Sequence, residues 1–184
     1  CRDSTGALMR EYEAAAEQTY RLAAEAFESG LKLNPYFRDG LFNLVNTYLT
    51  LNDSTGMLAP AQRLVGVDPL NRMSLRLLAF AHQRRGAVDS TLYYLRIADS
   101  LLVADVTVSQ FEPGDEQAEL RGIVTNMRST PSPAFTLVFE FLDTKGGVVA
   151  TDTAEVPTIE PQQSHAFTLT AAAPGILAWR YRKQ

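Results

Sequence analysis

The sequence predicts an α+β protein in which a helical domain is followed by a separate antiparallel β-sandwich. Residues 1–103 hold 11 Lys and Arg against 11 Asp and Glu, whereas residues 104–184 hold 6 against 10 and are rich in Val, Thr and Phe. Apolar residues recur at helical spacing in the first part and at every second position in the second. We therefore expect a tether at residues 1–6, helical hairpins at residues 7–103 and a sandwich at residues 104–184.

The stretch from Ala7 to Lys32 is dense in residues that favour helices, mainly Ala, Glu, Leu, Arg and Gln. No Gly or Pro interrupts it before Gly30, and Ser4 or Thr5 is suited to cap its start. This composition predicts one long helix or a tight helical pair.

Two prolines, Pro35 and Pro69, lie 34 residues apart, and each follows a helix-like run. This is the tetratricopeptide period. Apolar, small and aromatic residues fall at that family's positions in three successive segments: Ala23, Phe27 and Gly30; Leu41, Leu44, Val45 and Tyr48; and Leu75, Leu78, Ala79 and His82. The segment resembles tetratricopeptide repeats, which implies antiparallel helix pairs stacked into a small solenoid that holds other chains. Within it, we expect a helix from Met57 to Val67 with Pro60 in its first turn.

From Asp105 onward the period changes from 3.6 to 2, and turn residues recur every 8 to 14 positions. In Phe135–Phe141, alternate residues make one fully apolar face. The pattern predicts a β-sandwich of six strands: 106–111, 118–126, 135–143, 148–155, 164–170 and 176–182.

This second part also resembles the FxLYD-type immunoglobulin-like module of bacterial envelope proteins. The resemblance depends on Gly122 to Asn126, on Phe139 to Asp143 followed by Gly146 or Gly147, and on Pro161 six residues before Phe167. Phe141 stands in place of the motif's leucine and Leu142 in place of its tyrosine. Members of that family are described mainly as accessory or interaction modules, so the resemblance implies such a role rather than catalysis.

The sequence disfavours an enzyme. Its two histidines, His82 and His165, fit no zinc motif, and no Gly-x-Ser-x-Gly elbow or phosphate-binding glycine loop occurs. We expect no cofactor, no metal and no small-molecule substrate. A nucleic-acid partner is also disfavoured, because phosphate binding needs clustered Lys and Arg, and no such cluster occurs.

An interaction groove is the stronger expectation. In a tetratricopeptide stack the first helix of each repeat lines the concave face, and exposed Phe, Met and Arg there are enriched at protein interfaces. A groove that clamps the terminal carboxylate of a bound peptide would need a lysine at the position of Phe42. The sequence therefore disfavours a receptor for chaperone tails. The alternative is that Phe42 and Phe80 pack within the protein. The resemblance places eight residues along the groove: Asp39, Phe42, Asn46, Leu49, Met73, Arg76, Phe80 and Gln83.

Cys1 is the only cysteine and carries no initiator Met before it. Such a start resembles a mature bacterial lipoprotein, whose cysteine is acylated and anchors the chain to a membrane. The alternative is a cleavage or cloning boundary. On the first reading the protein is extracytoplasmic, in the periplasm.

Together these features predict a non-catalytic, lipid-anchored scaffold or assembly subunit of a larger membrane complex. Complexes for outer-membrane assembly, secretion, respiration or photosynthesis would all suit. The first alternative is a soluble periplasmic adaptor that binds an extended peptide in the groove, and the second is an enzyme whose site the sequence does not reveal.

Overall fold

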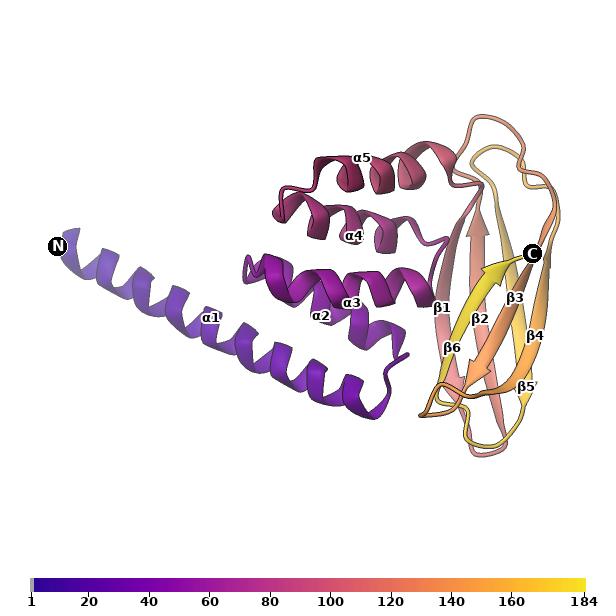
Figure 1. Ribbon diagram of the computed structural model, residues 1–184, viewed down its shortest axis with the longest axis horizontal. Helices are drawn as coiled ribbons and strands as arrows, with labels where there is room; N and C mark the ends of the chain where they lie inside the picture. The colour runs from indigo at the N-terminus through magenta and orange to yellow at the C-terminus, as the bar shows by residue number, and fades with distance from the viewer. Residues whose placement is uncertain (1) are drawn as a thin grey trace.

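A computed structural model describes residues 2–184 and confirms the predicted α+β class (Figure 1). The described residues form five α-helices, a π-helical turn and six strands. The helical elements are α1 (Arg2–Leu33), α2 (Arg38–Thr50), α3 (Ser54–Val67), α4 (Arg72–Arg84), α5 (Val88–Arg96) and the π-turn η1 (Ile97–Leu101). The strands are β1 (Asp105–Pro113), β2 (Gln117–Thr125), β3 (Phe135–Leu142), β4 (Val148–Val156), β5 (Ser164–Ala172) and β6 (Ala178–Lys183).

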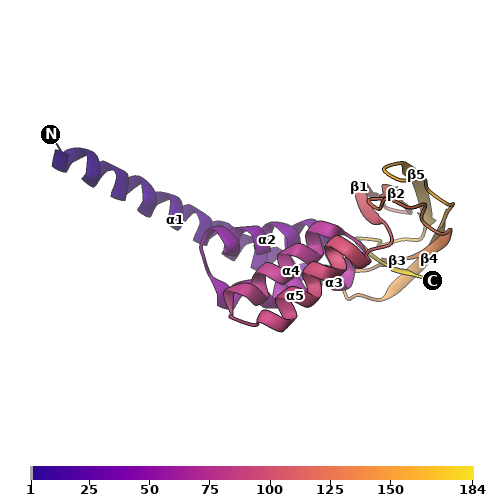
Figure 2. The same ribbon diagram turned by 90° about the horizontal axis from the view of Figure 1, so that it is seen from above.

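The first helix is a single continuous rod that begins at Arg2, so residues 2–6, which we expected to be a tether, belong to the helix. Cys1, the expected lipidation site, lies outside the described residues. Residues 7–22 are all exposed, whereas Ala24 and Leu31 are buried. Figures 1 and 2 show the same division, because the N-terminal half of α1 extends beyond the other helices.

Helices α2 to α5 form two antiparallel hairpins, α2 with α3 and α4 with α5. The second helix of each hairpin begins at a side-chain cap or after a tight turn. The prediction that Pro60 lies in the first helical turn is wrong, because α3 begins at Ser54 rather than Met57. The cause is Asp53, whose carboxylate accepts hydrogen bonds from the Thr55 and Gly56 amides at 3.0 and 2.9 Å. Pro60 is therefore a buried residue inside the helix.

The six strands form two three-stranded antiparallel sheets, in the orders β1-β2-β5 and β4-β3-β6. All six predicted strands are confirmed, with ends that differ by no more than two residues. In β3 the side chains alternate as predicted, with Phe135, Leu137, Phe139 and Phe141 buried. In β6, Trp179 and Tyr181 are buried between the sheets while Arg180 and Arg182 face outward.

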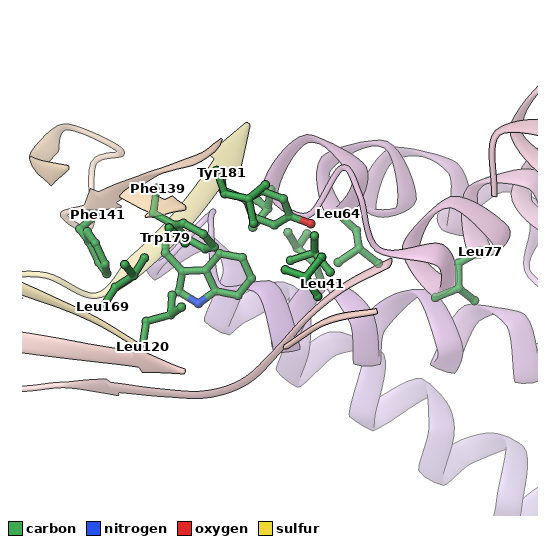
Figure 3. Close-up of a cluster of buried hydrophobic side chains, with 14 of the residues drawn as sticks. Leu41, Leu64, Leu77, Leu120, Phe139, Phe141, Leu169, Trp179 and Tyr181 are labelled. Atoms are coloured by element: carbon green, nitrogen blue, oxygen red, sulfur yellow. The ribbon is translucent and has the colours of Figure 1, made fainter. Parts of the chain in front are cut away.

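Most buried apolar residues of the helices and of the sandwich form one continuous cluster, and Leu75, Ala98 and Leu102 form a smaller one. Figure 3 shows where the two parts meet: Tyr181 of β6 points its hydroxyl toward Leu41 and Leu64 of the helices, and Phe139 and Trp179 lie beside it. The loop between α3 and α4 also joins β1, since the Val106 amide donates to the Leu70 carbonyl at 3.1 Å. The helical part is therefore bonded to the sandwich rather than linked by a free hinge.

A glycine in the β3–β4 turn tests how closely the two parts are joined. Gly146 has φ +81°, and a Cβ there would lie 2.3 Å from the ring of Tyr36, in the loop between α1 and α2. We expect Gly146→Ala to lower the free energy of unfolding by about 2–4 kcal/mol, because backbone strain adds to displacement of the ring. Chemical denaturation of both proteins measures this loss of unfolding free energy.

Gly175 is the matched control, because it has φ +76° but open space around its Cβ position. Gly175→Ala should therefore lower the free energy of unfolding only through backbone strain, by about 1–2 kcal/mol. Equal losses in the two variants would mean that the contact with Tyr36 contributes nothing.

Candidate protein-interaction surface

The first helices of the two hairpins, α2 and α4, line a shallow, open hollow of about 350 Å³. Leu49 of α2 is half-buried, and Phe80 of α4 leaves 38% of its surface exposed. Gln83 and Arg84 complete the wall, one turn of helix beyond Phe80. The volume lies at the lower end of the range for ligand pockets. An apolar side chain of a partner would fit it.

Three of the eight predicted groove residues, Leu49, Phe80 and Gln83, therefore share one site. The prediction missed the fourth lining residue, Arg84, although its position four residues after Phe80 places it on the same helical face. The Arg84 guanidinium donates to the Asn52 side-chain oxygen at 2.5 Å. The hollow thus combines an apolar floor with a cation at its edge, which suits an apolar residue that has an acidic neighbour.

Asp39 and Phe42 lie toward the other end of α2 and surround Arg38. The Arg38 guanidinium carbon lies 4.8 Å from the centroid of the Phe42 ring, and its Nη1 is 3.2 Å from the Asp39 carboxylate. Phe42 is half-buried against the core. This agrees with the alternative that Phe42 packs within the protein. Asn46 donates to the Phe42 carbonyl at 2.9 Å, within its own helix.

Arg76 is engaged by the protein itself. Its guanidinium and that of Arg72 both reach one carboxylate oxygen of Asp99 in η1, at 2.9 and 2.8 Å. The hydrogen bond from Arg72, and the charge of Arg76 beside it, hold the pKa of Asp99 below its usual value. Met73, at the start of the same helix, is 49% exposed. Arg76 therefore fixes α4 to η1, and Met73 is the freer of the two predicted contacts.

A second polar cluster, which the sequence did not predict, joins the two parts of the chain at Asp68. Its Oδ1 accepts from the Tyr181 hydroxyl at 2.8 Å and its Oδ2 accepts from Arg38 Nε at 3.0 Å. The Ser74 hydroxyl donates at 3.4 Å, and the Leu70 amide donates to the Tyr181 oxygen at 3.1 Å. Asp68 is fully buried. This cluster fixes the orientation of α2 and α4, and hence of the hollow, against β6.

Burial is the main influence on the titration of this cluster. It raises the pKa of Asp68 to about 6, although Arg38 and the Tyr181 hydroxyl act in the opposite direction. Burial and the adjacent carboxylate also raise the pKa of Tyr181 well above its ordinary value. The phenol therefore acts as a hydrogen-bond donor at neutral pH.

Three further findings concern the described residues. Within residues 2–184, no three or more His, Cys, Asp and Glu side chains gather closely enough to hold a metal ion. His82, which the repeat pattern placed in the core, is stacked on Tyr94 with ring centroids 5.5 Å apart. Across the described helices, none has both the length and the hydropathy needed to cross a bilayer.

The fold and this surface define a chain of helical hairpins joined to a β-sandwich, with an apolar hollow on the hairpins. No known protein family and no curated protein matches the sequence. Among solved structures, a DUF1425 family member from Shewanella sp. pv-4 is similar over 44% of this chain and 76% of its own, at 12% identity and a TM-score of 0.35.

Two other solved structures have lower scores. The alkylpurine DNA glycosylase AlkC of Pseudomonas fluorescens, bound to DNA with an abasic-site analogue, is similar over 84% of this chain and 51% of its own, at 8% identity and a TM-score of 0.31. A β-glucuronidase of glycoside hydrolase family 2 is similar over 40% of this chain, at 20% identity and a TM-score of 0.28, and the match spans 8% of that enzyme.

Proposed function

We propose that this protein is a non-catalytic scaffold or assembly subunit that holds other protein chains together in a larger membrane complex. The observation that carries the proposal is the hollow between α2 and α4, lined by the exposed Phe80 and the half-buried Leu49, with Arg84 at the edge. Buried contacts fix the helices to the sandwich. A partner bound to one part would therefore be held at a set position relative to the other.

The finer family assignments support the same role. On this proposal the hairpins are tetratricopeptide-like repeats and the sandwich is an FxLYD-type module. Both resemblances imply protein–protein interaction. The DUF1425 neighbour is compatible with the sandwich but, at its TM-score of 0.35, adds no argument about function.

The membrane part of the proposal depends on Cys1. Acylation there would anchor the protein on the extracytoplasmic side, since each buried methylene of an acyl chain contributes about 0.8 kcal/mol. The partner would then be a membrane-embedded assembly such as one for outer-membrane assembly, secretion, respiration or photosynthesis.

Intact mass spectrometry of the protein purified from its native membranes in mild detergent tests both parts together. We expect a mass excess that matches acyl chains on Cys1, and membrane subunits in fixed stoichiometry with it. An unmodified Cys1 in a soluble protein without co-purifying subunits would contradict the anchored scaffold.

The alternative function is a soluble adaptor that captures an extended peptide in the hollow, and Phe80→Ala distinguishes the two. A scaffold would contact its subunits over a wide interface of which the hollow is only one part, so we expect the variant to retain its membrane subunits, with a loss below about 2 kcal/mol. An adaptor would lose capture of peptides that carry an apolar residue beside Asp or Glu, measured on a peptide array.

Leu92→Ala is the matched control, because Leu92 is 60% exposed on α5, outside the hollow. It removes apolar surface from the same domain and should change neither measurement. Loss of peptide capture in Phe80→Ala, with Leu92→Ala unaffected, would favour the adaptor over the scaffold.

A further inference from the structure

A groove between α1 and α3 is separate from the hollow of α2 and α4, with which it shares no lining residue. It consists of two adjoining pockets. The junction pocket, of about 490 Å³, lies beside the sandwich and is lined in part by β6. The outer pocket, of about 430 Å³, lies farther along the helices and is lined in part by α2. Both volumes fall in the range of ligand-binding pockets.

Arg63 of α3 lines both pockets. Its Nη2 donates a hydrogen bond to the Pro35 carbonyl, in the loop after α1, at 2.5 Å. The side chain therefore crosses the groove and separates the two pockets. A guanidinium has five N–H donors, and the Pro35 carbonyl is a neutral acceptor. Among the described residues no carboxylate pairs with Arg63, so its charge and most of its donors remain available where the pockets meet.

The other charges along the groove are mainly positive. Arg180 of β6 lines the junction pocket; its Nε donates to Glu140 at 2.6 Å, and its side chain is 38% exposed. Lys32 lines the outer pocket and is exposed. Among the described residues that line the pockets, one has a carboxylate, Glu28, which accepts a hydrogen bond from the Tyr48 hydroxyl. The groove thus presents three cations against one carboxylate, in a chain whose net charge is −4.

Buried apolar residues lie on both sides of Arg63. Leu31 and Val67 line the junction pocket, and Leu44 and Pro60 line the outer pocket. All four are buried. The groove therefore has the order apolar pocket, cation, apolar pocket, which is complementary to a ligand with an acidic group between two apolar groups.

The length of the groove fits an extended peptide. Its wall on α3 runs from Gly56 to Gly66, which is ten residues and about 15 Å along the helix axis. In an extended chain every second side chain lies on the same face. An apolar, an acidic and an apolar residue at alternate positions therefore span four rises of about 3.3 Å, or about 13 Å.

We propose that the α1–α3 groove binds an extended acidic segment of a partner protein. A glutamate or aspartate of the segment bonds to Arg63, and the apolar side chains two residues before and after it occupy the pockets. Arginine suits this role because its planar guanidinium can donate two parallel hydrogen bonds to one carboxylate. The proposal does not rest on the scaffold function, because it concerns a different surface.

The groove is less suited to a lipid surface. Sites for anionic lipids usually cluster four to eight Lys and Arg, whereas three cations are spread along this groove. Because Arg63 separates the two pockets, they also form no continuous apolar channel for an acyl chain. A peptide meets both features, since its apolar side chains are separate and its charge lies between them.

Fluorescence anisotropy with labelled peptides tests the proposal on residues 1–184 carrying Cys1→Ser. The probe is Ser-Leu-Ser-Glu-Ser-Leu-Ser, and its control has Gln in place of Glu. We expect a dissociation constant of about 10 to 100 μM for the Glu peptide. The Gln peptide should bind at least about tenfold more weakly, because it lacks the charge-assisted hydrogen bonds.

Arg63→Gln should remove this discrimination, so that both peptides bind with the same weak affinity. Gln keeps a donor for the Pro35 carbonyl but has no charge. Arg96→Gln is the matched control, because it removes the same charge from an exposed position on α5 that lines neither pocket. It should change the dissociation constant by less than about twofold.

Gly66→Phe tests the same site without removing any bond. No atom lies within 4 Å of the Cβ position of Gly66, which lines the junction pocket, so a larger side chain can fill that pocket. We expect binding at least about tenfold weaker and no loss of thermal stability, since glycine is unfavourable inside a helix. Gly30→Phe is the matched control: its surroundings are equally open, but it lines neither pocket.

Three results would overturn the proposal. The first is equal binding of the Glu and Gln peptides by the native protein. The second is a loss of binding in Phe80→Ala but not in Gly66→Phe, which would place the peptide in the hollow of α2 and α4. The third is Arg63-dependent cosedimentation with vesicles of equal parts phosphatidylcholine and phosphatidylglycerol, without peptide binding, which would make a lipid surface the occupant.

Discussion

Asp68→Ala is expected to lower the free energy of unfolding by about 3–5 kcal/mol. The substitution removes the acceptor of the Tyr181 hydroxyl, which is buried, and of Arg38 Nε. Both donors then remain in the junction between the helices and β6 without their partner, at a cost that exceeds the loss of an exposed ion pair. Urea denaturation of both proteins measures the difference.

Asp99→Ala is the control for this result. Asp99 also binds two arginines, Arg72 and Arg76, but its side chain is 37% exposed. Water can solvate the released arginines, so we expect a loss of no more than about 1 kcal/mol. If Asp68→Ala cost no more than Asp99→Ala, the buried cluster would not be what holds the helices to the sandwich.

The pH dependence of stability follows from the same carboxyl. Its pKa is raised to about 6 in the folded protein from 3.8, chiefly by burial, so the folded state binds the proton more tightly than the unfolded state. The contribution of Asp68 to stability is therefore greatest below pH 4 and declines as the pH rises to 6, by up to about 3 kcal/mol.

Asp68→Asn isolates this contribution from that of other carboxylates, such as Asp99, whose lowered pKa acts in the opposite direction. We expect the unfolding free energy of the native protein, minus that of Asp68→Asn, to increase from pH 7 to pH 4. A difference that decreases on acidification would show that Arg38 outweighs burial and keeps Asp68 ionised.

The sequence predicted the elements well where the pattern is local. Strand β3 has apolar residues at every second position, and the predicted strand agrees with the observed one at its start and differs by one residue at its end. Similarly, the i, i+3, i+4 pattern of Leu41, Leu44 and Val45 identifies the buried face of α2. Such patterns are reliable because one face of each element must be covered whatever covers it.

Contacts between distant elements could not be predicted in this way. Asp68 and Tyr181 are 113 positions apart. In the sequence alone, Asp68 is simply the residue before a proline that ends a helix. The candidate site shows the same limit. The resemblance to tetratricopeptide repeats placed Leu49, Phe80 and Gln83 on facing helices. It could not show that Arg76 would instead bind Asp99, because that depends on where the chain runs after α5.

Phe139→Ala should have a comparably large effect, a loss of about 3–5 kcal/mol in unfolding free energy. Phe139 is fully buried, and its ring lies 5.0 Å from that of Tyr181 and 5.5 Å from that of Phe167, measured between centroids. These neighbours come from both sheets, so the cavity cannot close without moving one sheet toward the other. Because Tyr181 also binds Asp68, the variant should loosen the junction with the helices as well.

Phe80→Ala gives the matched comparison, since it removes the same side chain from a position that is 38% exposed. We expect it to cost about 1 kcal/mol or less, and to leave denaturation cooperative. In Phe139→Ala, hydrogen exchange at the Leu70 and Val106 amides, which bond across the junction, should increase together with that of β3. If β3 alone lost protection, the sandwich and the helices would unfold independently, and the continuous core between them would not couple their stability.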